Sequence, residues 1–468
     1  MYTNQFITHM KKTSIAITAV SVVTASLYAQ KKESIKPNMV LFIADDCTYL
    51  DLGVNGSKNV KTPNIDQFAT ESMQFTNAYQ SAPMSSPTRH NLYTGLWPVK
   101  TGAYPNHTFA KEGTLSIVQH LKPAGYRVAL IGKSHVAPES VFPFEYIPLK
   151  RNNELDFEAI DKFIKSCTES STPFCLFVAS NQPHTPWNKG DASKFNPDSL
   201  VLPPYYVDTK NLRDDLCRYY AEINFMDDEF GKVLDKINKY EQRDKTVVVF
   251  LSEQGNSLPF AKWTCYNTGV HSTYIVRWPQ VVKPNTKSEA IVEYVDIVPT
   301  FLEIAGTKPL SKLDGKSILP VLTGKKQMHK EFTFSLQTTR GIIQGSDHFG
   351  IRSVANSEFR YIVNLTPDAT FKNTETNGKN FKEWLKMADR DSTAKLLTYN
   401  YQHRPPVELY NIKKDPYCVV NLADKPEYKS IQVKLDKELK KWMKSCGDKG
   451  AATEMEALEH TNRQPDND

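Results

Sequence analysis

The chain has seven cysteines in 468 residues, and no two of them lie in a C-x-x-C spacing. This lack argues against a structural zinc site, which is usually built from such pairs, and against the dense disulfide framework of a small secreted domain. One or two disulfides stay open as an alternative. An odd number of cysteines leaves at least one thiol unpaired within the chain.

The sequence also has little net charge, no internal repeat and no low-complexity segment. A formal charge of +6 over this length fits an anionic substrate, but it is too weak to predict binding to nucleic acid or to a membrane surface. Hydrophobic residues make up 40% of the chain and charged residues 24%. This balance excludes fibrous and disordered classes and is typical of a globular protein with a large core and two domains.

Long hydrophobic runs are lacking except near the N-terminus. There, Lys11 and Lys12 precede an apolar run over 15–27, which ends in small residues and Ala29. This layout is typical of a secretory signal peptide over 1–29, and the run is short for a membrane span. No cysteine follows that could accept a lipid. We therefore expect a periplasmic or secreted protein with no membrane anchor.

Four apolar runs predict strands that are buried on both faces of a parallel sheet. Helical patterns separate them, and the clearest covers 212–237, where apolar residues recur every three or four positions. This alternation predicts an α/β fold, with a large doubly wound, mostly parallel sheet sandwiched by helices over 30–340. The four predicted strands cover 39–44, 126–131, 174–179 and 246–251.

The texture of the sequence changes after residue 340. Shorter alternating strands, such as those within 350–364, are followed by polar loops and a lysine-rich helix over about 428–444. We expect a smaller C-terminal α+β domain over 341–468, which carries a short antiparallel sheet and ends in a loosely ordered polar tail.

Each predicted strand delivers polar residues to one edge of the sheet, where open α/β sheets place their ligands. Taken singly, each of these residues could belong to a solvated turn or be a structural histidine or lysine. Adjacent carboxylates such as those after the first strand favour Ca²⁺ or Mg²⁺. The residues in strand order are Asp45 and Asp46, then Lys133 and His135, then His184, then Glu253 and Gln254.

A further polar segment lies between the first two predicted strands and reads Ser85-Ser86-Pro87-Thr88-Arg89, with Thr94-Gly95 after it. Pro87 suits the first turn of a helix, where backbone N–H groups are free to face an anion. Ser85 could there be a nucleophile beside an oxyanion, and an ordinary capped helix is the alternative.

The ordered set resembles the sulfatase family of the alkaline phosphatase superfamily, over nearly the whole chain after residue 29. That family's signature begins with Cys or Ser, continues with x-Pro-Ser-Arg and has Thr-Gly after four more residues; here Thr88 replaces its serine. The resemblance implies that Ser85 is oxidised to formylglycine, whose hydrated aldehyde supplies a gem-diol nucleophile. A serine at this position implies maturation by the radical enzyme of anaerobic bacteria.

The resemblance also implies a divalent cation. We expect Ca²⁺ rather than Mg²⁺, because all candidate ligands are oxygens. The cation would lower the pKa of the diol and polarise a sulfate oxygen. Most family members have Asp followed by Asn or His where this chain has Glu253 and Gln254, each longer by one methylene than Asp and Asn. The implied ligands are Asp45, Asp46, Ser85, Glu253 and Gln254.

By the same resemblance, several cations and histidines surround the sulfate. Arg89 would orient the diol, while Lys133 and Lys262 would neutralise charge on the sulfate as it transfers. His184 would protonate the leaving group, and His135 would act as the base that releases sulfate.

Several stretches resemble one branch of the family, the heparan N-sulfoglucosamine sulfohydrolases. They are 132–139 with 142–145, and 351–354 with 359–365. This resemblance implies that the N-sulfate of a terminal glucosamine is removed from a heparan or heparin fragment, so the partner would be a sulfated oligosaccharide. Candidate sugar contacts are His107, His271, Arg352, His403 and Arg404.

Three alternatives stay open. The same machinery would serve an O-sulfate on galactose, N-acetylgalactosamine or N-acetylglucosamine. A phosphatase or phosphodiesterase of the same superfamily would use an unmodified Ser85. An inactive glycan-binding relative is kept open by the departure at Glu253 and Gln254.

Overall fold

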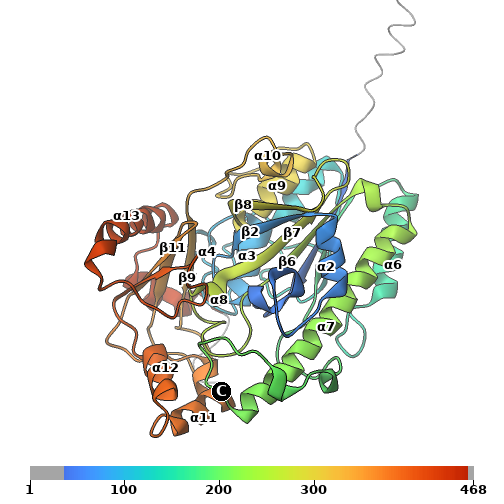
Figure 1. Ribbon diagram of the computed structural model, residues 1–468. Coiled ribbons are helices and arrows are strands. Elements are labelled where there is room, and N and C mark those ends of the chain that lie inside the picture. The colour runs from blue at the N-terminus through green and yellow to red at the C-terminus, as the bar shows by residue number, and fades with distance from the viewer. Residues whose placement is uncertain (1–35, 462–468) are drawn as a thin grey trace, which may run out of the picture. The chain divides into compact units, whose positions relative to one another are not determined.

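A computed structural model describes residues 36–461, and the signal peptide expected over 1–29 lies outside this range. An eight-stranded sheet with the order β4-β3-β5-β1-β6-β7-β2-β8 forms its centre (Figure 1). Every neighbouring pair is parallel except the two that include β7, which confirms the mostly parallel sheet. The strands are β1 (Asn38–Ala44), β2 (Met73–Tyr79), β3 (Arg127–Gly132), β4 (Glu145–Ile147), β5 (Phe174–Ala179), β6 (Thr246–Ser252), β7 (His271–Arg277) and β8 (Thr286–Glu293).

Alternate residues of the central strand β1 enter two different hydrophobic cores, one on each face of the sheet. Val40 and Phe42 pack with α2, α6 and α7, whereas Leu41 and Ile43 pack with α3, α5 and α9. Burial on both faces explains why β1 has a continuous apolar run instead of a polar–apolar alternation. The helices are α2 (Pro63–Thr70), α3 (Ser85–Thr94), α4 (Pro98–Thr101), α5 (Ile117–Leu121), α6 (Phe157–Glu169), α7 (Lys210–Lys239), α8 (Asn267–Val270), α9 (Ile297–Ile304) and α10 (Leu319–Leu322).

The long helix α7 confirms the predicted apolar stripe and extends it by two residues at each end. Its start is capped by Thr209, whose Oγ1 accepts a hydrogen bond from the backbone N–H of Leu212 at 3.2 Å. Leu216, Met226 and Phe230 of the stripe are almost completely buried. The helix crosses the sheet as one long green ribbon in Figure 1.

The C-terminal part contains a second, antiparallel sheet with the order β12-β11-β10-β9. The strands expected within 350–364 are β10 and β11, joined by a tight turn. Helix α13, two residues longer than expected at its C-terminal end, packs Leu435, Leu439 and Trp442 against this sheet. The elements are β9 (Thr333–Gln337), β10 (Ile351–Ala355), β11 (Phe359–Asn364), α11 (Lys379–Met387), α12 (Ser392–Gln402), β12 (Val407–Asn411), α13 (Lys429–Cys446) and α14 (Ala451–Met455).

The core on the α7 face continues into the C-terminal part of the chain. Trp384 of α11 and Tyr401 of α12 belong to the same buried cluster as Tyr206 and Phe260. The two sheets are thus tied together by shared apolar packing, and the division at residue 340 stays a prediction.

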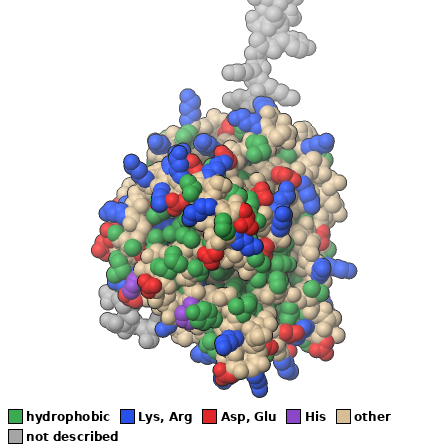
Figure 2. Space-filling model, turned by 60° about the vertical axis from the view of Figure 1, so that its left-hand side comes forward, with side chains coloured by type: hydrophobic (Ala, Val, Ile, Leu, Met, Phe, Trp, Pro, Cys, Tyr) green, Lys and Arg blue, Asp and Glu red, His purple; other side chains and the backbone are tan. Residues whose placement is uncertain are grey.

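The disulfides left open by the sequence do not form, because all seven cysteines are free thiols buried in the described range. Within residues 36–461, no helix is both long and apolar enough to cross a membrane. On the face shown in Figure 2, lysine and arginine side chains alternate with acidic ones. Several exposed lysines of α13 are paired in this way, including Lys434 with Glu331 and Lys440 with Asp436.

Candidate active site

Ser85 is the first residue of α3 and lies among side chains from the ends of β1, β3 and β6. Its hydroxyl faces carboxylate oxygens of Asp45 at 3.2 Å and of Glu253 at 3.3 Å. Ser85 Oγ also accepts hydrogen bonds from Gln254 Nε2 at 2.7 Å and from Lys133 Nζ at 3.2 Å. The structure therefore brings together the residues that the sequence placed at separate strand ends.

Two glycines allow the strand ends to approach this closely. A Cβ atom at Gly132, just before Lys133, would lie 1.9 Å from the carbonyl oxygen of Ala179 on the neighbouring strand, and the φ of 96° at Gly132 is one that L residues rarely adopt. A Cβ at Gly255, just after the acid–amide pair, would lie 2.0 Å from the carbonyl oxygen of Thr268. Larger residues at either position would push the site apart.

Several site residues themselves adopt the left-handed backbone conformation. The φ angles are 55° at Asp46, 53° at His107, 49° at His135 and 70° at Trp263. Such angles are uncommon for residues other than glycine and cluster at functional sites, where the surrounding packing holds them. The backbone at this edge of the sheet therefore departs from regular secondary structure at the residues that form the site.

Two pairs of basic and acidic side chains flank Ser85, and Lys133 in one of them is partly exposed. Lys133 Nζ lies 2.5 Å from Asp45 Oδ2, while Arg89 contacts both carboxylate oxygens of Glu253 at 3.0 Å. Burial by itself would raise the pKa of Asp45, but the charges of Lys133 and Arg89 outweigh it and hold the pKa well below its usual value. Asp45 is therefore ionised at neutral pH.

A second carboxylate, that of Asp46, is held by three donors. Its Oδ2 accepts from Lys262 Nζ and Ser257 Oγ, both at 2.7 Å, and its Oδ1 accepts from Gln254 Nε2 at 2.6 Å. Burial opposes the charged forms of both Asp46 and Lys262, yet their mutual attraction lowers the pKa of Asp46 and raises that of Lys262. Lys262 therefore stays a cation beside Asp46.

The histidine at the end of β5 has a defined tautomer. His184 Nδ1 lies 2.6 Å from the carbonyl oxygen of Thr185, which can only accept, so Nδ1 carries the proton. His184 Nε2 faces Lys262 Nζ at 3.4 Å and Asp46 Oδ2 at 3.5 Å. This nitrogen is placed to exchange a proton with a group bound beside Lys262.

The second histidine, His135, lies against a third. His135 Nε2 is 3.1 Å from His107 Nδ1, and the two rings are 4.8 Å apart. Burial, together with the positive charge of Lys133, keeps the pKa of His135 well below its usual value. His135 is therefore neutral near pH 7 and able to accept a proton.

These side chains open into a cavity of about 570 Å³, a volume typical of small-molecule sites. One wall of the cavity comes from the loop around Trp263 and from the C-terminal part of the chain. That wall contains Trp263, Ile342, Ile343, Thr374 and Glu375.

Comparison with protein families decides what this site belongs to. Residues 37–307, more than half of the chain, match the family described as Sulfatase. The chain belongs to the sulfatase family. It is accordingly a hydrolase of sulfuric esters. Residues 255–370 of this sulfatase also match the family described as N-sulphoglucosamine sulphohydrolase, C-terminal.

Individual relatives match most of the chain. An ulvan-active sulfatase of Formosa agariphila is 32% identical, over 88% of this chain and 81% of its own length. Human N-sulphoglucosamine sulphohydrolase is 27% identical, over 86% of this chain and 89% of its own length. Among solved structures, one determined with D-glucosamine-2-N,6-O-disulfate as its substrate has a TM-score of 0.66 at 19% identity, covering 89% of this chain and 99% of its own, which shows the shared fold.

The oxygen donors of this sulfatase fit a hard divalent cation. Gln254 Oε1 is buried without a hydrogen-bond partner, and exchanging the two amide atoms would turn this oxygen toward Asp46 and Ser85. The carboxyl groups of Asp45, Asp46 and Glu253 add hard oxygen donors around Ser85. Within residues 36–461, no group of three His, Cys, Asp or Glu side chains is arranged to hold a metal ion. Lys133 pairs with Asp45 and Arg89 pairs with Glu253.

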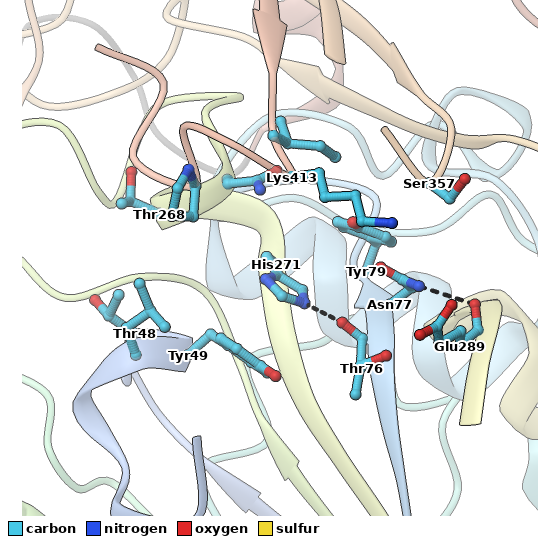
Figure 3. Close-up of a pocket in the computed structure, with 14 residues that line it drawn as sticks. Thr48, Tyr49, Thr76, Asn77, Tyr79, Thr268, His271, Glu289, Ser357 and Lys413 are labelled. Atoms are coloured by element: carbon cyan, nitrogen blue, oxygen red, sulfur yellow. Dashed lines mark hydrogen bonds between the residues drawn. The ribbon is translucent and has the colours of Figure 1, made fainter. Parts of the chain in front are cut away.

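Only one of the candidate sugar contacts reaches this cavity. His107 lines it beside His135. His271 lies in a different cavity of about 270 Å³, where its ring stacks on Tyr49 at 3.8 Å and its Nε2 donates to the carbonyl oxygen of Thr76 (Figure 3). Burial lowers the pKa of His271 to about 4, although the hydrogen bond to Thr76 opposes the shift.

The two arginines and His403 are also placed elsewhere. Arg352 is fully buried in an ion pair with Asp448, and Arg404 is 2% exposed and bonded to Glu408 Oε1 at 2.7 and 2.9 Å. Neither guanidinium can reach a sugar, so both expectations are corrected. His403 is exposed at the end of α12, stacked on Tyr399.

Other cavity residues of this sulfatase were missed by sequence reasoning. Ser257 lies three residues after Gln254, and its role in holding Asp46 could have been suspected from that proximity. Glu375 lies in a polar loop with no motif around it. Burial raises the pKa of Glu375 to about 8, although nearby Lys262 opposes the shift. Only the tertiary structure brings Glu375 to the cavity.

Proposed function

We propose that this sulfatase hydrolyses the N-sulfate of glucosamine in heparan or heparin fragments. The observation that carries the proposal is the match of residues 255–370 to the C-terminal model of N-sulphoglucosamine sulphohydrolases. This range includes Lys262 and much of the wall that faces Ser85. The human enzyme of that name, matched over most of both chains, adds support.

The nucleophile in this proposal is formylglycine made from Ser85, and Ser85 Oγ marks the position of one diol hydroxyl. The modification would supply a gem-diol, which is a stronger nucleophile than an unassisted serine. Asp45, which is ionised at neutral pH, is close enough to accept its proton, whereas burial raises the pKa of Glu253 to about 8. Arg89 orients this group indirectly, because it holds Glu253 through both of its carboxylate oxygens.

Lys133 and Lys262 bind the transferring sulfate from two sides. Their charges are already present before substrate arrives, so they stabilise the transition state without reorganisation. His184 Nε2 protonates the departing nitrogen, and neutral His135 accepts a proton when sulfate is released. Because Nδ1 keeps its own proton, which it donates to the carbonyl oxygen of Thr185, the proton that Nε2 delivers is a second one, and His184 acts as an imidazolium in this step.

We further propose Ca²⁺ as the resident cation, with Mg²⁺ second. Asp45, Asp46, Glu253 and Gln254, with Ser85, would hold it, and it would supply Lewis acidity toward the sulfate. The test is thermal unfolding after chelation. Added Ca²⁺ should raise the melting temperature of the parent protein and leave that of Asp46→Asn unchanged. Equal behaviour of the two proteins, or no shift in either, would contradict this cation site.

The substrate is tested by sulfate release from a panel of N-sulfated and singly O-sulfated glucosamine and galactose sugars. Release from N-sulfated glucosamine alone is the expected result. Cleavage only of O-sulfated sugars would overturn the N-sulfate proposal and leave the sulfatase assignment intact. The proposed nucleophile exists only after Ser85 has been modified. The panel therefore uses protein that was matured in an anaerobic host.

A carbohydrate O-sulfatase is the second candidate. It is favoured by the ulvan-active sulfatase of Formosa agariphila, which is more similar to this chain than the human enzyme is. The two candidates share the same catalytic groups and differ in the leaving atom, an alcohol oxygen instead of a nitrogen. The panel above separates them.

The modification itself is tested by peptide mass spectrometry at residue 85. We expect the mass of formylglycine, made by a radical maturation enzyme of the serine type, in protein from an anaerobic host. An unmodified Ser85 with phosphatase or phosphodiesterase activity would favour the superfamily alternative. An unmodified Ser85 that binds glycan without turnover would favour the inactive glycan-binding relative.

We propose that the chain forms two domains with a boundary near residue 340.

We also propose export to the periplasm or the outside of the cell, based on the signal-peptide pattern over 1–29. The sequence read from the N-terminus of exported protein should begin near residue 30. An intact N-terminus on the mature, cytoplasmic protein would contradict export.

A further inference from the structure

The active-site cavity has a neighbour on the opposite side of the catalytic lysine. This second hollow has a volume of about 510 Å³ and shares Lys133, His184 and Thr185 with the cavity around Ser85. Two of the shared residues, Lys133 and His184, act on the sulfate and the leaving group in the proposed function. The two hollows therefore meet at the reacting centre and form one cleft with two lobes.

Side-chain amides dominate the second lobe. The amide groups of Asn153, Gln182 and Asn188 make no hydrogen bond with any residue in 36–461, although each residue lines the hollow. An amide offers both donors and an acceptor, as do the hydroxyl groups of a sugar. Asn152 and Asn181 add two more amides to the same lining. We call this set, with Asn153, Gln182 and Asn188, the amide lobe.

The backbone that carries the amide lobe is firmly held. Buried Glu222 accepts hydrogen bonds from the backbone N–H groups of Asn188 at 2.5 Å and Lys189 at 2.9 Å. The indole N–H of Trp187 donates to the carbonyl oxygen of Pro183 at 2.9 Å. An ion pair between Lys189 and Glu154 links the two loops of the lobe. A preorganised surface loses little entropy when a ligand binds.

We infer that the amide lobe binds the sugar unit next to the sulfated one, so that the minimal good substrate is a disaccharide. The sulfated unit occupies the lobe around Ser85, and its neighbour hydrogen-bonds through hydroxyls to Gln182 and Asn188. The inference rests on the proposed function only in requiring a sulfated glycan as substrate. It adds a length requirement that the catalytic residues by themselves do not impose.

Binding tests the inference without depending on turnover. N-sulfated glucosamine and a disaccharide with the same unit at its non-reducing end are titrated calorimetrically into Ser85→Ala protein. We expect the disaccharide to bind about tenfold more tightly, because a few added hydrogen bonds provide that factor. The ratio of the two affinities should fall to about one when Gln182→Ala and Asn188→Ala are added.

A matched control is Asn400→Ala, which removes an exposed amide from α12 that lines neither lobe. It should leave the affinity ratio unchanged. Equal affinities for the two sugars, or an unchanged ratio in the double variant, would overturn the inference. Sulfate release by the matured parent protein is measured alongside, because its absence on every sugar refutes the proposed function, whereas binding still decides the amide lobe.

Discussion

At the residue scale, the departure at Glu253 and Gln254 has a structural consequence. The extra methylene lets Glu253 reach both nitrogens on one edge of Arg89, and lets Gln254 bridge Asp46 and Ser85. On the same backbone, the side chain of Asp or Asn would be one methylene shorter and would reach less far toward these partners. The longer pair therefore still points at Ser85, which favours a working site over an inactive relative.

The first prediction concerns Ser85 and His184, which we expect to be needed for catalysis but not for folding. Ser85→Ala and His184→Ala should each lower kcat by at least about 100-fold, since nucleophilic and general-acid groups contribute factors of that order. Both proteins should stay folded, with melting temperatures within about 5 °C of the parent. Circular dichroism melts and sulfate-release assays check this, and a collapsed melting temperature with normal specific activity of the folded fraction would contradict it.

The second prediction separates Arg352 from substrate recognition. Arg352→Met leaves the carboxylate of Asp448 buried without its partner, which should cost about 3–5 kcal/mol of unfolding free energy. KM, measured well below the melting temperature, should not change, because Arg352 does not reach the cavity. Urea unfolding and initial-rate kinetics provide the two readouts.

Arg352→Lys is the matched control for this prediction. It keeps the charge but loses the second hydrogen bond of the guanidinium, so a smaller loss of stability is expected. A rise in KM with unchanged stability in either variant would restore Arg352 as a sugar contact.

At the scale of one element, α7 combines an apolar stripe with buried carboxylates that face the catalytic loops. Glu222 holds the backbone of Asn188, and Glu229 accepts a hydrogen bond from Ser180 Oγ at 2.6 Å. Burial raises the pKa of both carboxyl groups to about 7. This helix therefore supports the amide lobe, and its buried carboxyl groups make the free energy of unfolding depend on pH.

The third prediction follows from Glu229. Its folded pKa lies above the unfolded value of 4.5, so the folded state holds the proton longer and stability falls as pH rises from about 4.5 to 7. Glu229→Gln removes this loss while Ser180 keeps an acceptor. The variant should gain up to about 3 kcal/mol relative to the parent between pH 5 and pH 8.

Urea unfolding of both proteins at pH 5 and pH 8 measures this gain directly. Buried groups that do not interact with Glu229 titrate equally in the two proteins and cancel in the difference, whereas Glu222, whose charge helps to raise the pKa of Glu229, contributes to it. A difference in unfolding free energy that is the same at both pH values would show that Glu229 does not titrate in this range.

At the scale of the whole molecule, stability comes from packing on both faces of one sheet and from the core shared with the C-terminal part, with no covalent cross-link in the described residues. Each thiol is buried, and burial raises the pKa of Cys47 and Cys175 well above the usual value. Thiolates, which are the reactive form, are therefore scarce.

The fourth prediction follows from this lack of cross-links. Reductant should not change the melting temperature, even in protein recovered from an oxidising compartment. Thiol titration after denaturation should find seven free cysteines per chain, the full number in the sequence. Fewer thiols, or a melting temperature lowered by reductant, would contradict the prediction.

The sequence by itself determined the features that depend on local pattern. Continuous apolar runs mark strands buried on both faces. The polar residues that follow these strands reach the same sheet edge by the topology of parallel strands, and Ser85 joins them at the start of a helix. The apolar spacing of α7 likewise reports its buried face. These are properties of neighbouring residues, so they can be read without the rest of the chain.

Only the tertiary structure decided which distant side chains meet. Arg352 and Asp448 lie 96 positions apart, and their pairing turned an expected sugar contact into a buried support. Glu375 and Trp263 form one cavity wall, and His271 belongs to another cavity. No local signal marks such contacts, because a charged residue has the same sequence pattern whether it meets a ligand, water or a buried partner.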